Sequence, residues 1–267
     1  MTNTPEAKTM TFWEHLAELR GRLIKTALAF VVGSIVAWVF RERLLVWVTA
    51  PFAQAWTEAG LKGDPQLHFA APAALFVAYI KLAMIAGFTL ALPFVLYQIW
   101  AFVAPGLYSH EKRYALPFVL SSTALFTTGA YFCFRVVFPN AFRYLLSFGG
   151  EVAATRFAIT PTVMIEEYIT FSVRMLVAFG VVFELPVLVF FLSVAGIVTY
   201  RDLLRFARYF IVIAFIVGAV ITPPDPLSQL LLAIPLIGLY GVSVLIAFVV
   251  GRRRTKQADS TDLEDAG

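Results

Sequence analysis

Six long apolar stretches dominate this chain and leave few folds open to it. Apolar residues make up 60% of the 267 residues and charged residues 14%, whereas soluble domains have about 25% charged residues. The stretches do not alternate as barrel strands do, so helices are expected. Since only helices and closed barrels cross lipid, we predict an all-α integral membrane protein. The six spans are expected at Leu23 to Phe40, Pro72 to Trp100, Tyr114 to Val137, Thr162 to Ala195, Phe206 to Ile221 and Leu227 to Val250.

Lysine and arginine residues gather on one side of these spans. With the N-terminus inside, the inner segments hold 13 of them and the outer segments hold 5. Because cytoplasmic loops are enriched in Lys and Arg, both termini are predicted to be cytoplasmic. The chain then divides into a cytoplasmic amphipathic segment (1–22), a six-helix transmembrane domain (23–250) and a cytoplasmic tail (251–267) that is expected to be disordered.

The outer side carries two long connections, residues 41–71 and 138–161. Both contain aromatic residues and are expected to form a cap on the membrane. The fifth span is short, because only 13 uncharged residues separate Arg208 from Thr222. They make about 20 Å of helix, whereas the hydrocarbon core is about 30 Å thick. The short fifth span, with the sixth beside it, is therefore expected to thin the bilayer.

Two glutamates lie among basic residues on the cytoplasmic side. His15, Glu18 and Arg22 share one helix face, and Glu18 lies too deep in the helix to cap it. An ordinary ion pair between Glu18 and Arg22 is the structural alternative. Glu111 follows the second span and is flanked by His110, Lys112 and Arg113, so a solvated loop charge is its alternative.

Glu184 is the only charged residue between Arg174 and Arg201. An ionisable group that faces lipid is costly, so Glu184 is expected to face a cavity or a partner. A buried ion pair with Lys81 or Arg174 is the alternative. Pro186 is expected to kink the fourth span close to this glutamate.

The outer ends of the fifth and sixth spans are joined by a tight, proline-rich turn, residues 222–226. Asp225 and Gln229 are further polar candidates at this turn. A purely turn-forming role for Asp225 remains open as the alternative.

Four motifs occur in order along the six spans. They are "HLAELRGRL" (15–23), "YQIWAFVAPGLYSHEKR" (97–113), "FGVVFELPV" (179–187) and "TPPDPLSQLLLAIP" (222–235). In this order they resemble the TatC family, the core receptor of the twin-arginine (Sec-independent) protein translocase. The resemblance covers roughly residues 12 to 250 and implies a concave face, a location in the cytoplasmic (inner) membrane and a homo-oligomeric complex.

The resemblance also implies partners and sites. Folded cargo proteins present signal peptides with two consecutive arginines at the cytoplasmic face, and TatA- and TatB-type single-span proteins assemble near the fifth and sixth spans. Transport draws on the proton-motive force. The implied signal-peptide residues are Glu18, Glu111, Phe102, His15 and Arg20. The other implied residues are Glu184 on the concave face, Thr222, Gln229 and Asp225 for partner binding, and Pro51 in the first outer connection.

Other functions find less support in the sequence. A proton-coupled transporter of a small solute would use Glu184 with Lys81 and Arg174 as its relay, but no internal repeat accompanies it. "HEKRY" lacks the second histidine of a zinc site, and no catalytic set is placed together. We expect no enzyme activity, cofactor, metal or nucleic-acid partner, and membrane lipids as the surroundings.

Overall fold

The computed structural model describes residues 12–61, 63–103, 115–151, 158–222 and 225–264. Within this part of the chain, six helical segments are long and apolar enough to cross a membrane, which confirms the predicted class. The crossings consist of α1 (Phe12–Val39), α3 (Pro72–Val103), α4 (Ala115–Phe132) continued by the π-helical turn η3 (Cys133–Val137) and α5 (Phe138–Leu146), α6 (Ile165–Val182) with α7 (Leu185–Val194), α8 (Tyr200–Ile221) and α9 (Pro226–Glu264).

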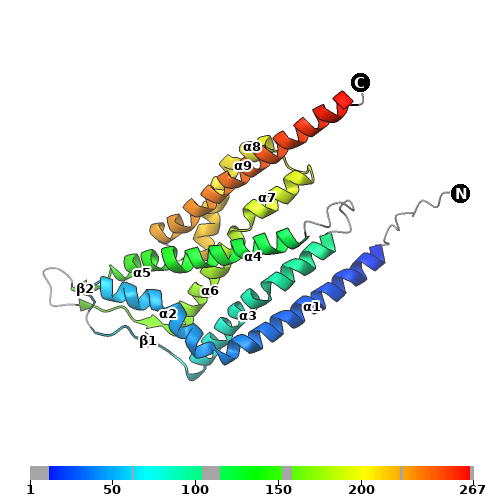
Figure 1. The fold of residues 1–267 in the computed structure, drawn as a ribbon. Helices are drawn as coiled ribbons and strands as arrows, with labels where there is room; N and C mark the ends of the chain where they lie inside the picture. The colour runs from blue at the N-terminus through cyan, green and yellow to red at the C-terminus, as the bar shows by residue number, and fades with distance from the viewer. Residues whose placement is uncertain (1–11, 62, 104–114, 152–157, 223–224, 265–267) are drawn as a thin grey trace.

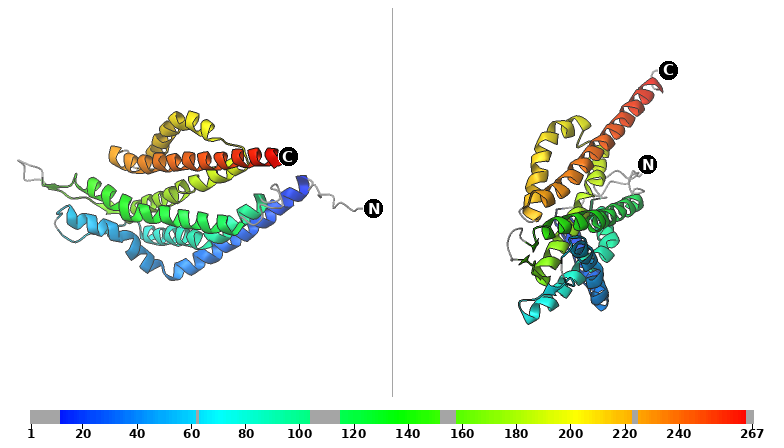
Figure 2. Two further views of the ribbon diagram at one scale, coloured as in Figure 1. Left: turned by 45° about the horizontal axis from the view of Figure 1, so that its top comes forward. Right: turned by 90° about the vertical axis from the view of Figure 1, so that its left-hand side faces the viewer.

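The N-terminal end of α1 and the C-terminal end of α9 lie at the same end of the bundle, as Figures 1 and 2 show. The opposite end holds α2 (Arg41–Glu58), α5 and the short strands. This arrangement agrees with an even number of crossings. The membrane side on which each end lies remains the prediction drawn from the lysine and arginine distribution.

Helices α1 and α3 pack side by side through small residues (Figure 1). A Cβ atom added to Gly87 would lie 2.3 Å from the Ser34 backbone nitrogen, and one added to Gly33 would lie 2.6 Å from the Gly87 carbonyl oxygen. Such close approach of two backbones is how membrane helices gain contact where no hydrophobic driving force acts between them. The α1–α3 pair therefore depends on glycine at these positions.

The fourth crossing is broken where the sequence predicts a kink. Helix α6 ends at Val182, and α7 begins at Leu185 with Pro186 in its first turn. Proline has no N–H to donate and tolerates the first turn of a helix, so it favours a new start here. The break places Glu184 at the junction of the two helices.

Each of the two long outer connections contains a helix. Helix α2 packs against α5, and Glu58 is paired with Arg143 between them. The Arg143 guanidinium and the Gln54 amide hold the pKa of the Glu58 carboxyl below its usual value. The Tyr168 hydroxyl of α6 donates to the Val48 carbonyl at 2.7 Å. These contacts join α2, α5 and α6 into one apolar core at this end of the molecule.

Two short strand pairs complete the same end. β1 (Leu67–His68) pairs in parallel with β4 (Val163–Met164), and β2 (Gly150–Glu151) pairs antiparallel with β3 (Ala158–Ile159). The first pair ties the connection before α3 to the start of α6. The sequence reasoning predicted a cap here but none of its helices or strands.

Several helix ends differ from the sequence prediction. Helix α1 begins at Phe12, so residues 12–22 are its first turns, and α8 begins at Tyr200 because Thr199 and Asp202 form a capping box. Helix α9 continues to Glu264, beyond the end at Val250 that was expected for the sixth span. Residues 251–264 are mostly good helix formers, and extending a formed helix needs no new nucleus.

Candidate functional site

The end of the bundle at which α1 begins brings two predicted residues together. His15, in the first turn of α1, stacks on Phe102, in the last turn of α3, with ring centroids 4.5 Å apart and an angle of 18° between the planes. These residues are 87 positions apart in the sequence, and the tight α1–α3 packing is what aligns them. The stack forms one wall of the candidate site.

Glu18 lies one turn further along α1 and is held by Arg22. The Arg22 Nε donates to Glu18 Oε1 at 2.9 Å, and the Arg22 Nη1 donates to the Gln98 side-chain oxygen of α3 at 3.3 Å. The ion pair that the sequence offered as a structural alternative is therefore present. The Glu18 side chain is 21% exposed and that of Arg22 is 23% exposed, so the pair is partly shielded from water.

The second carboxylate oxygen of Glu18 has no such partner. Glu18 Oε2 is buried and has no hydrogen-bond partner among the described residues. An ionised carboxylate accepts bonds at both oxygens, and a buried acceptor without a partner costs free energy. The arrangement thus holds the carboxylate in place through one oxygen and leaves the other without a donor.

The other predicted signal-peptide residues are placed differently. Arg20 is exposed and lies two residues after Glu18, about 200° around the helix, so it faces away from the Gln98 side. Glu111 lies outside the described residues. The structure therefore brings together His15, Glu18 and Phe102, and adds Arg22 and Gln98 to them.

Glu184 faces another polar residue inside the bundle. Its carboxylate points to the Ser122 hydroxyl and the Phe126 backbone of α4. Within the described chain, neither Glu184 Oε1 nor Ser122 Oγ has a hydrogen-bond partner. The junction of α6 and α7 therefore holds a polar spot in an apolar surround, formed by residues from two crossings.

The cationic residues that were alternatives for pairing with Glu184 lie elsewhere. Lys81 Nζ donates to Thr170 Oγ1 at 2.8 Å and lies 3.5 Å from Glu166 Oε1. Arg174 is an exposed residue of α6. The alternative reading, an ion pair of Glu184 with Lys81, is not found, because Lys81 pairs with Glu166. The three residues of the solute-transport relay do not form one cluster.

The predicted partner-binding residues lie at the turn between α8 and α9, and one of them, Gln229, bonds across from α9 to α8. Thr222 is buried and its hydroxyl donates to the Gly218 carbonyl at 2.8 Å. The Gln229 amide donates to the Phe215 carbonyl at 2.9 Å, and Asp225 accepts from the Ser228 N–H at 2.8 Å. Asp225 therefore caps the start of α9, which is the turn-forming role that the sequence left open.

Pro51 lies inside α2 and is buried against the core of the outer end. Its neighbour Phe52 contacts Trp56, Phe142 and Tyr168 through its ring. A proline inside a helix removes one backbone donor. Pro51 thus shapes a helix that packs against both α5 and α6.

Sequence reasoning passed over two residues that the structure adds to the sites. Gln98 is an amide near the end of the second span, and Ser122 is one of three consecutive hydroxyl residues in the third span. Polar side chains within spans usually face the bundle interior, and this signal pointed to both. Their partners could not be read from the sequence, because each partner lies on another helix.

Comparison with known proteins shows which family has this sequence and architecture. The family model "Sec-independent protein translocase protein (TatC)" matches residues 14–235. The TatC protein of Aquifex aeolicus is 38% identical over 245 residues, which cover 92% of this chain and 98% of that protein. The TatC protein of Desulforapulum autotrophicum is 37% identical over 263 residues, which cover 97% of this chain and 93% of that protein.

A solved structure agrees with these relatives. The crystal structure described as the twin arginine translocase receptor TatC superposes with a TM-score of 0.77 at 39% identity, covering 89% of this chain and 100% of that one. The six crossings and the likeness along almost the whole chain together show a multi-pass membrane protein. The chain belongs to the TatC family of Sec-independent protein translocase components.

Proposed function

We propose that this chain is the receptor subunit of a twin-arginine translocase. It binds the Arg-Arg signal peptides of folded proteins at the site formed by the N-terminal end of α1 and the C-terminal end of α3. Both chain termini and this site lie in the cytoplasm, and the protein resides in the inner membrane. The observation that carries the proposal is the buried, unpartnered Oε2 atom of Glu18.

The chemistry of the site favours arginine over lysine. A guanidinium has a planar fork of donors that matches a carboxylate, whereas an ammonium acts as a point charge. Arg22 already fixes the orientation of Glu18 through Oε1, so an incoming arginine meets a carboxylate that does not need to be ordered. The stacked His15 and Phe102 rings offer an apolar and aromatic surface beside it.

Glu111 supplies the second carboxylate in this proposal, and His15, Arg20 and Phe102 contribute the surrounding surface. Charge-assisted hydrogen bonds contribute about 1.5–3 kcal/mol each when they are shielded from water. Two such sites would give an affinity difference between Arg-Arg and Lys-Lys peptides that a binding assay can measure. The surrounding Lys and Arg residues repel a basic peptide, so the geometry of the carboxylates must provide the selectivity.

Assembly uses the other sites. TatA- and TatB-type single-span proteins pack along α8 and α9 near Thr222, Asp225 and Gln229, and several copies of the complex form a homo-oligomer. Glu184 and the surrounding concave face ease the passage of the signal peptide, which enters as a hairpin. Pro51 maintains the structure of the outer end of the molecule. Transport of the folded cargo is driven by the proton-motive force, without enzymatic chemistry in this chain.

The test is binding of labelled signal peptides to the purified protein in nanodiscs. We expect the Arg-Arg peptide to bind more tightly than the Lys-Lys peptide. Glu18→Gln should remove most of this preference, by about tenfold for one shielded charge-assisted bond. Combining Glu18→Gln with Glu111→Gln should remove the rest.

The matched control is Glu42→Gln, which removes an exposed glutamate at the far end of the molecule. This variant should keep the wild-type preference for arginine. Equal affinity of the two peptides for the wild-type protein would contradict the proposal. The glutamates would then be ordinary helix and loop charges.

A further inference from the structure

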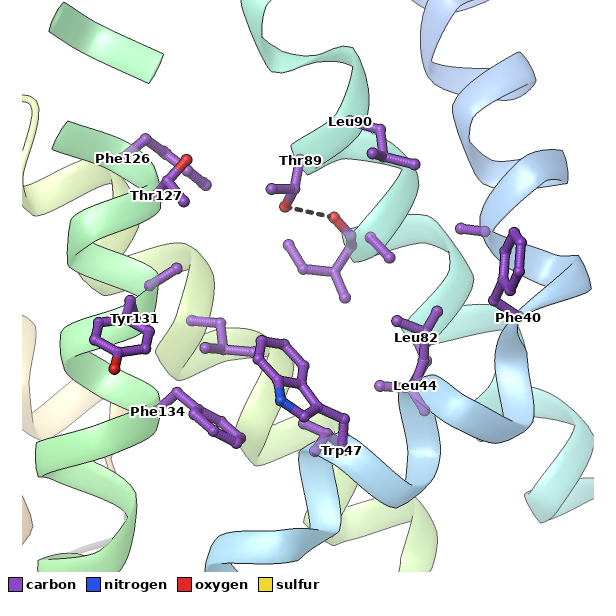
Figure 3. A pocket seen from close by; sticks show the side chains of 16 residues that line it. Phe40, Leu44, Trp47, Leu82, Thr89, Leu90, Phe126, Thr127, Tyr131 and Phe134 are labelled. Atoms are coloured by element: carbon purple, nitrogen blue, oxygen red, sulfur yellow. Dashed lines mark hydrogen bonds between the residues drawn. The ribbon is translucent and has the colours of Figure 1, made fainter. Parts of the chain in front are cut away.

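A groove opens between α1, α2, α3 and α4, on the same end of the bundle as the α1–α2 corner. It encloses a volume of about 430 Å³. Figure 3 shows Trp47 near its centre, with Phe134 and Tyr131 on one side and Leu82, Leu44 and Phe40 on the other. The floor residues Leu82, Phe126 and Phe134 are buried, whereas the rim residues Trp47, Leu90 and Tyr131 are more than half exposed.

The groove offers almost no polar group to an occupant. The Thr89 hydroxyl donates to the Ile85 carbonyl at 2.9 Å, a bond drawn in Figure 3, and the Thr127 hydroxyl donates to the Thr123 carbonyl at 2.7 Å. Trp47 stacks on Phe134 with centroids 4.5 Å apart. The lining is therefore apolar and aromatic, and its two threonine hydroxyls are bonded within their own helices.

The groove reaches from the end of the crossings into the membrane. Along α3 it runs from Leu82 to Leu90, which is about 12 Å of helix. Along α4 and η3 it runs from Phe126 to Phe134, over a similar length. An occupant that enters at the α1–α2 corner can thus extend well into the hydrocarbon region.

Two arginines flank the groove where α2 begins. Arg43 is exposed, lines a shallow depression that shares Trp47 with the groove, and has no ion-pair partner among the described residues. Arg41 lies over the Trp38 ring at 5.2 Å and donates to the Trp38 carbonyl at 3.4 Å. Glu42 lies 3.7 Å from Arg41 and lines the same depression as Arg43, so these three side chains together carry one net positive charge.

We propose that this groove binds one anionic phospholipid of the adjoining leaflet. The acyl chain lies in the apolar groove, and the phosphate and headgroup meet Arg43, with Arg41 on the other flank. Charge complementarity selects this occupant, because an apolar channel with a free cation at its mouth matches a molecule with an anionic head and an apolar tail. Tryptophan and arginine at one level are also typical of the membrane interface. The proposal does not depend on signal-peptide binding.

The experiment places a photoreactive p-benzoylphenylalanine at Thr127, an exposed groove residue, in the full-length protein. The protein is irradiated in vesicles that mix phosphatidylglycerol with phosphatidylcholine, and its intact mass is measured. We expect an adduct with the mass of one phospholipid, enriched in phosphatidylglycerol above its share of the vesicle. Arg43→Gln should lower that enrichment about two- to fivefold, the range for an exposed charge pair.

Two matched controls make the result specific to the groove. The same probe at Thr128, the next residue and also exposed but outside the groove, should give adducts that follow the vesicle composition. Arg205→Gln, which removes an exposed arginine on α8, should leave the Thr127 adduct unchanged. The proposal would be overturned if the adducts at both probe positions had the same lipid composition. It would also be overturned if Arg43→Gln did not change the enrichment of phosphatidylglycerol at Thr127. In native membranes, a polypeptide adduct at Thr127 would show that a protein helix occupies the groove instead.

Discussion

Glu18 and Glu184 each hold one carboxylate oxygen that has no hydrogen bond among the described residues. The first lies at the end of the bundle, beside an arginine that already binds its other oxygen. The second lies between two crossings, opposite a serine whose hydroxyl is equally without a partner. Because burying an unsatisfied polar atom costs about 1–3 kcal/mol, both positions are more readily explained by binding than by stability.

Replacing Glu184 by leucine tests this explanation. Leucine has a similar size and removes the unpartnered oxygen, so we expect the free energy of unfolding in detergent to rise by about 1–3 kcal/mol. Cargo transport in vesicles should fall at the same time, because the polar spot between α4 and α7 is lost. Thermal unfolding and a transport assay on the same variant provide the two readouts.

The isosteric control is Glu184→Gln, which keeps a polar side chain facing Ser122. It should retain more transport than the leucine variant and gain less stability. If Glu184→Leu transports like the wild type, the glutamate has no part in transport. Loss of stability in that variant would instead mean that Ser122 and the Phe126 backbone already satisfy the carboxylate.

The α1–α3 pair is the element that builds the candidate recognition site. Glu18 and His15 lie on α1, while Gln98 and Phe102 lie on α3. Their alignment depends on the distance between the two helix axes, which is set at Gly33 and Gly87. A change about 16 Å away along α3 can therefore alter the site without touching it.

Gly87→Ala should separate these helices. The added methyl group would lie 2.3 Å from the Ser34 nitrogen and 2.5 Å from its Cα, and neither backbone atom can move away alone. We expect a loss of about 1–3 kcal/mol in the free energy of unfolding. Weaker signal-peptide binding should accompany it, measured in the nanodisc assay.

Gly21→Ala in α1 is the matched control, since a Cβ atom there has no neighbour within 4 Å. It should leave signal-peptide binding unchanged. The free energy of unfolding should stay the same or rise slightly, because alanine has a higher helix propensity than glycine. Equal behaviour of the two alanine variants would show that the glycine contact does not set the geometry of the site.

At the scale of the whole molecule, both helix ends nearest the termini lie at one end of the bundle (Figure 2). With 13 Lys and Arg residues predicted on that side and 5 on the other, we expect this end to face the cytoplasm. Single cysteines placed near each terminus, in a Cys133→Ser background, should be labelled by a membrane-impermeant reagent only after the membrane is opened. Labelling of either terminus in intact cells would refute the topology.

The sequence by itself determined the class and the order of the crossings. Continuous apolar runs demand helices in a membrane, and Pro186 signals the break in the fourth crossing before any contact is known. The spacing of His15, Glu18 and Arg22 also placed them on one face, since helix geometry is local. These features depend only on neighbouring residues and on the solvent that surrounds them.

Only the tertiary structure decided which distant residues meet. In the folded chain His15 stacks on Phe102, and Arg22 bonds to Gln98. Lys81 pairs with Glu166 and not with Glu184. Glu184 lies opposite Ser122. The outer connections contain the helices α2 and α5, and a groove is lined by residues of several crossings and of α2. Side-chain partners depend on how helices cross, and the crossings follow from packing over the whole bundle, which local periodicity does not encode.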